Sequence, residues 1–257
     1  MNDRLTKKER QERILERLGS DVTVRISTLA EQFNVTTETI RRDIDELTDR
    51  GLVDRTYGGA ASKSLSSEPA MEQRRLTHVE ERERIGSCAA GLIEPGDVVM
   101  IDAGSTTLHF ARALASLDMD LTILTNCLAV AHVLGSIRRI RVMLCPGEFR
   151  EAESGLYGEE TATFLDRFTA NKAVIGAGGV LDDEITDADS QAAWVKRKMI
   201  ERSEKSILLL DHSKFGTRLF STVCTASQLD HIVLDRTPPP QMASICRNAG
   251  LQVHIAS

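Results

Sequence analysis

The sequence contains no uninterrupted apolar run of about 18 residues or more, so no segment is predicted to cross a membrane as a helix. Residues 1–18 are rich in charge and lack the apolar stretch of a secretory signal, which predicts a cytoplasmic protein. Aromatic residues are scarce at 4%, but 41% of the chain is hydrophobic and 27% is charged, as in folded soluble domains. These proportions exclude fibrous and largely disordered proteins.

The five cysteines are odd in number, widely spaced and never arranged as C-x-x-C, which argues against a disulfide framework and against a zinc site. We expect them to be buried apolar side chains in a reducing compartment. His109 and His132 lack metal-ligand spacing, the loop lysine of a P-loop is missing, and no G-x-S-x-G motif occurs. The sequence therefore predicts no metal, no cofactor and no serine hydrolase.

Positive charge is not in surplus. The net charge is −6, and residues 1–60 carry 11 Lys and Arg against 12 Asp and Glu, which leaves 21 against 26 in the remainder. Nucleic-acid-binding proteins often carry a basic surplus, so this balance argues mildly against DNA binding. A DNA-binding interpretation therefore rests on where individual arginines lie.

Apolar spacing in the first sixty residues predicts three short helices followed by a hairpin with two glycines at its turn. Residues 6–9 have the spacing of a capping box at the start of the first helix. Residues 26–33 carry an apolar helical face, and Thr36 or Thr37 can cap a third helix that runs to Arg50.

The second and third predicted helices are joined by a tight turn at residues 34–35, as in a helix-turn-helix, whose second helix enters the DNA major groove. On the third helix the apolar residues cluster on one side and the arginines lie away from them. Arginine pairs with guanine edges or phosphate through its planar fork. The candidate DNA-binding residues here are Thr36, Thr37, Thr39, Arg41 and Arg42. The alternative is a solvated face on which the two arginines pair with Asp45 or Glu46.

The composition changes after residue 60. Residues 61–78 are rich in serine and charge, which predicts a linker. Apolar strands then alternate with amphipathic helices, which predicts a mainly parallel α/β sheet with right-handed crossovers. The strands are expected at residues 98–101, 121–124, 140–144, 173–176, 206–210, 232–234 and 252–255. The predicted organisation is a DNA-binding domain over residues 1–60, a linker over 61–78 and an α/β domain over 79–257.

Residues 102–107 form an Asp-Ala-Gly-Ser-Thr-Thr loop between an apolar strand and an amphipathic helix. Hydroxyls and backbone N–H groups at a helix N-terminus form a site for phosphate or another anion. The alternative is structural: Gly104 allows a tight turn, and Ser105 or Thr106 caps the helix.

Other polar residues follow the expected carboxyl ends of strands, namely Thr125, Asn126, Gly147 and Lys214. Ligands of open α/β sheets bind beyond these ends, so we expect the residues to gather around one binding site. Lys214 supplies the positive charge that the loop of residues 102–107 lacks. The acidic residues between 182 and 189 are expected to be solvated.

The N-terminal part resembles the signature of the DeoR family of bacterial transcriptional regulators. The matching stretches are residues 29–36, 39–44 and 51–60. The resemblance implies a winged helix-turn-helix, with Arg55 and Tyr57 of the wing near the DNA backbone. Arg25 departs from the pattern, because a small capping residue is usual before the second helix.

The second half resembles the effector domain of the same family, which shares its fold with ribose-5-phosphate isomerase and coenzyme A transferases. The matching stretches are residues 101–107, 124–126, 176–179, 195–200 and 209–216. This resemblance implies a phosphorylated sugar or related metabolite as effector. It implies that the phosphate is held by Gly104, Ser105, Thr106 and Thr107. It also implies that the effector is approached by Asp102, Thr125, Asn126, Gly147, Lys196 and Lys214. Ala192 departs from an acidic residue that is frequent in the family.

These observations predict a two-domain regulator, by analogy a repressor of carbohydrate-metabolism genes that a phosphorylated sugar releases from operator DNA. One winged helix buries too little DNA for tight specific binding, so we expect a homo-oligomer, a dimer or a tetramer. No membrane partner is expected. Two alternatives stay open: a sugar-phosphate isomerase with a fused helical domain, and an N-terminal module for oligomerisation alone. An isomerase needs a carboxylate base, and Lys196 aligns about where that glutamate would lie.

Overall fold

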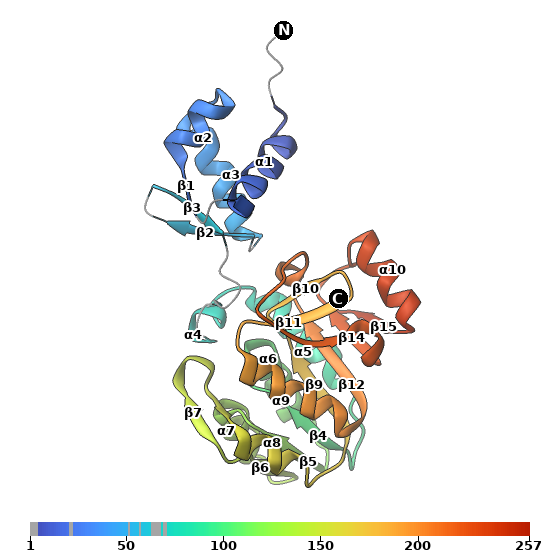
Figure 1. Cartoon of the computed structure of the whole chain (residues 1–257). Coiled ribbons are helices and arrows are strands. Elements are labelled where there is room, and N and C mark those ends of the chain that lie inside the picture. The colour runs from blue at the N-terminus through green and yellow to red at the C-terminus, as the bar shows by residue number, and fades with distance from the viewer. Residues whose placement is uncertain (1–4, 21–22, 51, 57, 63–67, 69–70) are drawn as a thin grey trace. The chain divides into compact units, whose positions relative to one another are not determined.

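The computed structural model describes residues 5–20, 23–50, 52–56, 58–62, 68 and 71–257. The chain divides into two compact units, Met1–Ser67 and Glu68–Ser257 (Figure 1), and each has a hydrophobic core of its own. Within the described residues, no helix is both long enough and apolar enough to cross a membrane.

The first unit combines three helices with a three-stranded antiparallel sheet of order β1-β3-β2 (Figure 1). Its elements are α1 (Lys7–Ser20), β1 (Thr23–Arg25), α2 (Ile26–Phe33), α3 (Thr37–Asp49), β2 (Val53–Thr56) and β3 (Gly59–Ser62). The three helices and the β2–β3 hairpin, or wing, confirm the predicted winged helix-turn-helix. Strand β1 was not predicted, because three residues are too few for a periodic pattern.

Local sequence explains where these helices begin and end. The backbone N–H of Thr6 donates to Glu9 Oε2 at 2.8 Å, and that of Glu9 donates to Thr6 Oγ1 at 3.3 Å, which confirms the capping box. Asn34 ends α2 in the left-handed conformation, with φ of 50°. Thr36, rather than Thr37, caps α3, because its hydroxyl accepts the N–H three residues on.

The second unit is built on a seven-stranded sheet whose neighbouring strands are all parallel. In spatial order the strands are β15 (Gln252–Ile255), β14 (His231–Leu234), β12 (Ser203–Leu210), β9 (Ala170–Gly176), β4 (Val98–Ile101), β5 (Leu121–Thr125) and β6 (Ile140–Leu144). Each lies where an apolar run predicts it. The sheet grows from β4 to β6 in one direction and from β9 to β15 in the other. The order therefore reverses between β4 and β9, the place where open α/β sheets bind ligands.

Helices connect most of these strands. The longer ones are α5 (Val79–Ala90), α6 (Ser105–Ala115), α7 (Leu128–Gly135), α9 (Ser190–Glu201) and α10 (Pro240–Ala249). Because crossovers between parallel strands are right-handed, the reversal of strand order puts α6 and α9 on opposite faces of the sheet. Gly86 lets α5 approach α6, since a Cβ there would lie 2.7 Å from the backbone of His109.

Several short elements lie where the sequence predicts only loops. They are β7 (Glu148–Arg150), η1 (Glu151–Glu153), β8 (Gly155–Tyr157), α8 (Glu159–Leu165), β10 (Gly179–Leu181), β11 (Glu184–Asp187), η2 (His212–Lys214), β13 (Ser221–Thr225) and η3 (Ala226–Gln228). Strands β7 and β8 form a hairpin, and β10, β11 and β13 form a small antiparallel sheet. Such lengths are too short to reveal a period in the sequence.

Part of the segment expected to be a linker belongs to the second unit, which begins at Glu68. Helix α4 (Met71–Arg74) packs there, because Met71 is 1% exposed and joins the core of that unit. This segment therefore contributes side chains to the edge of the sheet at which the binding site is predicted.

Candidate DNA-binding surface and effector pocket

Helix α3 has one buried and one exposed face, as its apolar spacing predicts. Ile40, Ile44 and Leu47 are at most 1% exposed. By contrast, 77% of the Arg42 side chain and 49% of the Arg41 side chain are accessible. Both guanidinium groups can therefore reach base edges or phosphates of DNA.

The two arginines share one acidic partner at the surface. Glu38 accepts a hydrogen bond from Arg41 Nη1 at 2.8 Å, and its other oxygen lies 3.6 Å from Arg42 Nε. Exposed pairs of this kind contribute about 0–1 kcal/mol, because water and salt screen them. A DNA phosphate can therefore replace Glu38 at small cost.

Asp45 and Glu46, the partners that the solvated-face alternative assigns to these arginines, pair elsewhere. Asp45 contacts Arg55 of β2, and Glu46 contacts Lys7 of α1 at 2.5 Å. The pairing that this alternative assigns is therefore wrong, because both acids reach towards other elements of the unit.

The other predicted DNA-binding residues lie near the start of α3 and on the wing. Thr36 and Thr37 are exposed, and the Thr39 hydroxyl lies 2.9 Å from that of Thr36. Arg55 is half exposed on β2 and joins α3 through its contact with Asp45. Tyr57 lies outside the described residues.

A buried ion pair fixes α3 against α1. Asp43 is 2% exposed and accepts hydrogen bonds from Arg10 Nε and, at 3.0 Å, from Arg10 Nη2. Such a bidentate pair restrains orientation as well as distance. The sequence analysis missed it, and its effect is to hold the buried side of α3 against α1.

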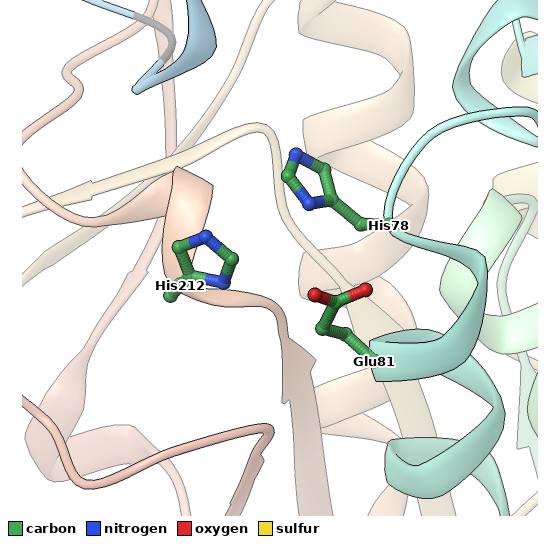
Figure 2. A group of neighbouring side chains, drawn as sticks. All are labelled: His78, Glu81 and His212. Carbon is green, nitrogen blue, oxygen red and sulfur yellow. The ribbon is translucent and has the colours of Figure 1, made fainter. Parts of the chain in front are cut away.

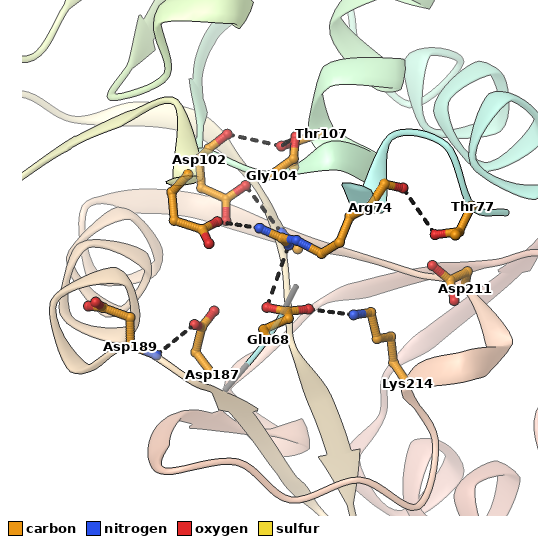
Figure 3. Close-up of polar contacts among 12 residues, drawn as sticks. Glu68, Arg74, Thr77, Asp102, Gly104, Thr107, Asp187, Asp189, Asp211 and Lys214 are labelled. Carbon is orange, nitrogen blue, oxygen red and sulfur yellow. Dashed lines mark hydrogen bonds and ion pairs between the residues drawn. The ribbon is translucent and has the colours of Figure 1, made fainter. Parts of the chain in front are cut away.

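The second unit has a pocket at the carboxyl edge of its sheet, beside the reversal point between β4 and β9 (Figure 3). Its empty volume is about 390 Å³, open mouth included. Predicted residues that line it are Asp102, Gly104, Ser105, Thr106, Lys196 and Lys214. The remaining lining residues are Glu68, Arg74, Ala103, Glu153, Gly176, Ala177, Asp187 and Ala192.

Helix α6 begins at this pocket. Gly104 is its N-cap, and no side chain caps the helix, so the alternative role of Ser105 or Thr106 as a cap was wrong. Among the residues that the structure describes, neither hydroxyl has a hydrogen-bond partner, so both are left for a ligand. The first N–H groups of the helix, which have no partner within it, are available as well. Thr107 differs, because its hydroxyl donates to the carbonyls of Asp102 and Gly104, both at 3.0 Å. Thr107 thus holds the loop in shape.

Lys196 of α9 is the most buried cation that lines the pocket. Its ammonium lies 2.8 Å from Asp102 Oδ2 and 3.0 Å from Asp187 Oδ2. Burial alone would lower a lysine pKa, but the two carboxylates raise the pKa of Lys196 well above its usual value. Burial has the opposite effect on Asp102 and raises the pKa of that carboxyl, although Lys196 opposes the shift.

Asp102 keeps one incompletely used acceptor. Its Oδ1 accepts the N–H of Gly176 at 3.3 Å. Its Oδ2 is close to Lys196 without the angle of a hydrogen bond, and within the described structure it has no hydrogen-bond partner. Buried polar atoms are rarely left so. This oxygen is also inaccessible to solvent, and its close charged partner is Lys196.

The remaining two cations pair with glutamates (Figure 3). Lys214 Nζ donates to Glu68 Oε1 at 2.6 Å, and Arg74 lies 3.5 Å from Glu68 Oε2. Arg74 also contacts Glu153. Burial would raise the pKa of Glu68, but Lys214 and Arg74 together lower it to about 2. Burial raises the pKa of Glu153 above its usual value, despite Arg74.

Thr125, Asn126 and Gly147 were also predicted as effector residues but are not among the described residues that line the pocket. The Thr125 hydroxyl donates to a carbonyl of β4 at 2.7 Å, and the Asn126 amide donates to a carbonyl of β8 at 3.0 Å. Gly147 has a φ of 142°, and a Cβ there would lie 2.6 Å from the Tyr157 carbonyl oxygen. In this structure the three residues join strand ends next to the pocket.

The two units match two family models. The model described as "DeoR-like helix-turn-helix domain" covers residues 10–65. The model described as "DeoR C terminal sensor domain" covers residues 77–236, more than half of the chain. The chain is a member of the DeoR family of transcriptional regulators. Its first unit holds the helix-turn-helix domain of the family, and its second unit holds the sensor domain.

Similar DeoR-type proteins are regulators and repressors by name. The chain is 33% identical to the glycerol-3-phosphate regulon repressor of Escherichia coli (strain K12), over 96% of this chain and 98% of that protein. It is 31% identical to the HTH-type transcriptional repressor CsqR of the same strain, over 97% and 95%. It is 30% identical to the HTH-type transcriptional regulator IolR of Bacillus subtilis (strain 168), over 91% and 93%.

Solved structures resemble the fold more distantly. Ribose 5-phosphate isomerase A from Methanocaldococcus jannaschii has a TM-score of 0.42 and 14% identity, over 54% of this chain and 55% of that one. The eIF2B beta subunit from Chaetomium thermophilum has a TM-score of 0.46 and 15% identity, over 93% and 70%. Scores below 0.5 carry no functional inference.

Sequence reasoning did not place Glu68, Arg74, Glu153 or Asp187 in the pocket of this DeoR-family protein. The first two lie in the expected linker, and Glu153 lies in a turn without a motif. Asp187 was expected to be solvated, which is wrong: it is 6% exposed and pairs with Lys196. A buried lysine such as Lys196 needs a counter-ion. This need is the only sign in the sequence that a nearby acid, here Asp187, would be buried.

Proposed function

We propose that this DeoR-family regulator is a repressor that binds operator DNA through α3 and the wing, and that a phosphorylated metabolite in the sensor pocket releases it. The observation that carries the proposal is the pocket itself, in which the N-terminus of α6 with two uncommitted hydroxyls lies among three cationic side chains. Such a set of donors and charges suits a phosphate ester. The names of similar proteins support repression as the outcome.

On the operator, Arg41 and Arg42 pair with guanine edges or phosphates, and the threonines at the start of α3 approach neighbouring bases. Arg55 of the wing contacts the DNA backbone. One such module covers only a half-site, so we propose a homo-oligomer, a dimer or a tetramer, that presents two α3 helices to successive major grooves.

In the sensor domain, the phosphate of the effector accepts hydrogen bonds from the first N–H groups of α6 and from Ser105 and Thr106. Lys214 and Arg74 balance its charge. The effector class is a small phosphorylated sugar or related metabolite, because the site offers donors and cations for the phosphate.

We propose binding without turnover. Proton abstraction beside a carbonyl needs a carboxylate free to act as base, whereas Asp102 and Asp187 both pair with Lys196. Ribose 5-phosphate incubated with the purified protein should remain unchanged, and formation of a ketose phosphate would favour the isomerase alternative. The five free thiols, four of them buried, support a reducing cytoplasm as the place of action.

The effector assignment is tested by titration of the purified chain with glycerol 3-phosphate and a panel of sugar phosphates. Trp194 of α9 reports on the site, since it is two residues from Lys196 and 43% exposed. A ligand at about 100 times its Kd stabilises the fold by about 2.7 kcal/mol. We expect phosphorylated compounds to change both fluorescence and melting temperature, and their unphosphorylated counterparts to change neither. A full panel without any shift would contradict the proposal.

A further inference from the structure

The carboxylate of Glu68 lies between two cations that line the pocket (Figure 3). Its oxygens are 2.6 Å from Lys214 Nζ and 3.5 Å from Arg74 Nη1. The Glu68 side chain is only 8% exposed, and the pair of cations keeps it ionised at neutral pH. A carboxylate and a phosphate both present acceptor oxygens to such cations, so the two compete for one position.

The two cations are held in place by groups other than Glu68. Arg82 is 2% exposed and donates to Asp211 Oδ2 at 2.9 and 3.0 Å, and its third nitrogen donates to the carbonyl of Arg74. Asp211 directly precedes the η2 turn that carries Lys214, and its carboxylate accepts the N–H of Ser213 within that turn at 3.1 Å. This buried pair therefore positions both cations, and departure of Glu68 leaves an anion site already formed.

The charge of the pocket also favours the departure of an acid when an anion binds. Its lining carries four carboxylates and three cations. A phosphate that simply joined this set would add to the excess of negative charge in a largely buried site. Asp102 and Asp187 are committed to Lys196. Glu68 is the carboxylate that spans both Arg74 and Lys214.

Glu68 is also the point at which the chain enters the sensor unit, since the helix-turn-helix unit ends at Ser67. The next buried side chain described along the sensor unit is Met71, at 1% exposure. If Glu68 leaves the pocket, Met71 becomes the first residue that anchors the chain to the sensor unit, three residues further along the sequence. Three residues span at most about 10 Å, which is the upper limit for the lengthening of the tether to the DNA-binding unit.

We propose that Glu68 is an internal competitor of the effector: its carboxylate occupies the phosphate position in the DNA-binding state, and an incoming phosphate displaces it and lengthens the tether. This inference rests on the proposed function and adds the route by which the pocket reaches the helix-turn-helix unit. With a longer tether, the two DNA-binding units of an oligomer are less restrained relative to each other. Their simultaneous binding to two half-sites is therefore weaker.

The test compares the full chain with Glu68→Gln, and with Glu184→Gln as a control that makes the same change at an exposed ion pair with Arg218. Calorimetry measures binding of inorganic phosphate and glycerol 3-phosphate, and anisotropy measures binding of a fluorescent operator selected from random duplexes. Glu68→Gln should bind the phosphate compounds about tenfold more tightly or better, because no internal carboxylate competes. Without ligand it should bind the operator more weakly than the wild-type chain does.

The outcomes separate this inference from the function on which it rests. If ligand releases the wild-type chain but Glu68→Gln behaves as Glu184→Gln in both assays, the competitor role is refuted and the effector function stands. If phosphate compounds bind no variant, or bind without changing operator affinity, the proposed function itself fails and the inference falls with it. Glu68→Ala serves as a second variant if Glu68→Gln does not fold, and the same results are expected of it.

A separate cluster joins His78, Glu81 and His212 (Figure 2). One ligand atom from each residue lies within 4.8 Å of those from the others. His78 is the N-cap of α5 in a left-handed conformation with φ of 52°, Glu81 lies in the first turn of that helix, and His212 begins η2. Figure 2 shows the three side chains converging on one space between α5 and the η2 turn.

The cluster has the supporting contacts of a metal site. His212 Nδ1 lies 2.8 Å from Asp235 Oδ2, and the Asp235 side chain is fully buried. Histidines that ligate metals typically give their second ring N–H to a carboxylate in this way, which leaves Nε2 for the ion. The Arg82–Asp211 pair clamps the two segments together, because its members adjoin Glu81 and His212 in the chain.

We infer that this cluster binds a divalent transition-metal ion, with Zn²⁺ as the best match. Two imidazole nitrogens and one carboxylate oxygen are three of the four ligands of an open tetrahedral site, and water completes it. This revises the expectation of no metal, which followed from spacing along the chain. The ion would fix the η2 turn and with it Lys214 of the effector pocket.

The test is titration of the tag-free, chelator-treated chain with Zn²⁺ in competition with a chromophoric chelator, and with Co²⁺ followed by its visible absorption. We expect one saturable site, lost in His78→Ala and in His212→Ala but retained in the control His132→Ala on α7. Asp235→Asn should weaken binding by about 10–100-fold. Absence of a saturable site, or equal binding by the wild-type chain and the two histidine variants, would refute the assignment.

Discussion

The helix-turn-helix unit and the sensor unit hold their functional cations in opposite ways. Arg41 and Arg42 share the exposed Glu38, whereas Lys196 lies between two buried carboxylates. Exposed pairs contribute about 0–1 kcal/mol, but removal of one partner of a buried pair costs about 3–5 kcal/mol. The DNA-binding surface therefore accepts a polyanion as it stands. On our proposal, the sensor pocket accepts an anion only when the carboxylate of Glu68 moves.

The largest effect expected from this contrast is on stability. Lys196→Ala leaves Asp102 and Asp187 buried without a counter-ion, so the free energy of unfolding should fall by about 3–5 kcal/mol. Lys205→Ala, which removes a 56% exposed lysine from Asp230, should cost far less, because water screens that pair. Denaturant unfolding of both variants measures the difference, and equal losses would remove the distinction between the two kinds of pair.

The second effect concerns the coupling between the units. Ser105→Ala combined with Thr106→Ala removes two donors at the start of α6, so the response of operator binding to glycerol 3-phosphate or another bound sugar phosphate should disappear. That response is expected to be about 1–3 kcal/mol in the wild-type chain. Operator anisotropy with and without ligand measures it, with Ser116→Ala at the end of α6 as the control. A normal response in the double variant would refute the phosphate loop.

A third change acts on the exposed arginines. Arg42→Ala should weaken operator binding by about 1–3 kcal/mol while the melting temperature stays unchanged, because the side chain is 77% exposed and holds only a weak ion pair. Lys8→Ala on α1, a side chain that is 88% exposed, is the matched control. Unchanged operator binding by Arg42→Ala would contradict the assignment of α3 as the recognition helix.

A fourth effect is a change in the pH dependence of stability. The pKa of Glu68 is lowered from 4.5 to about 2, so its ion pairs stabilise the fold above about pH 4.5. That contribution is lost as the pH falls towards 2, because protonation removes the charge. The free energy of unfolding of Glu68→Gln should therefore fall less steeply over this range than that of the wild-type chain. Parallel slopes would show that Glu68 is not held between the cations.

Much of the fold could be predicted from local patterns. The spacing of Ile40, Ile44 and Leu47 gives the buried face of α3, and the apolar runs give all seven strands of the parallel sheet. The loop at the start of α6 and its place at the edge of the sheet also follow from sequence, because a strand, a glycine-hydroxyl loop and an amphipathic helix are consecutive there. Hydrophobic periodicity and turn residues are patterns of a few consecutive residues, so they can be recognised directly in the sequence.

The charged partners could not be predicted, because they pair across long stretches of chain. Asp43 lies 33 residues from Arg10, and Lys214 lies 146 residues from Glu68. Each of these acids is also unremarkable in its local sequence. Glu68 lies in a segment whose composition suggests a linker, and only the fold shows it beside the pocket. The sequence alone therefore does not show which charged side chains pair in the fold, including the pair that an anionic ligand would meet in the pocket.

The central claim is that an anion in the sensor pocket loosens the hold of α3 on DNA. Its most direct test is anisotropy of a fluorescent operator bound to the full chain, titrated with each sugar phosphate and with the same sugar lacking phosphate. We expect a bound phosphorylated compound to lower operator affinity by about 5–150-fold. We expect its unphosphorylated counterpart to leave operator affinity unchanged. If calorimetry shows the phosphorylated compound bound while operator affinity stays unchanged, the account is contradicted.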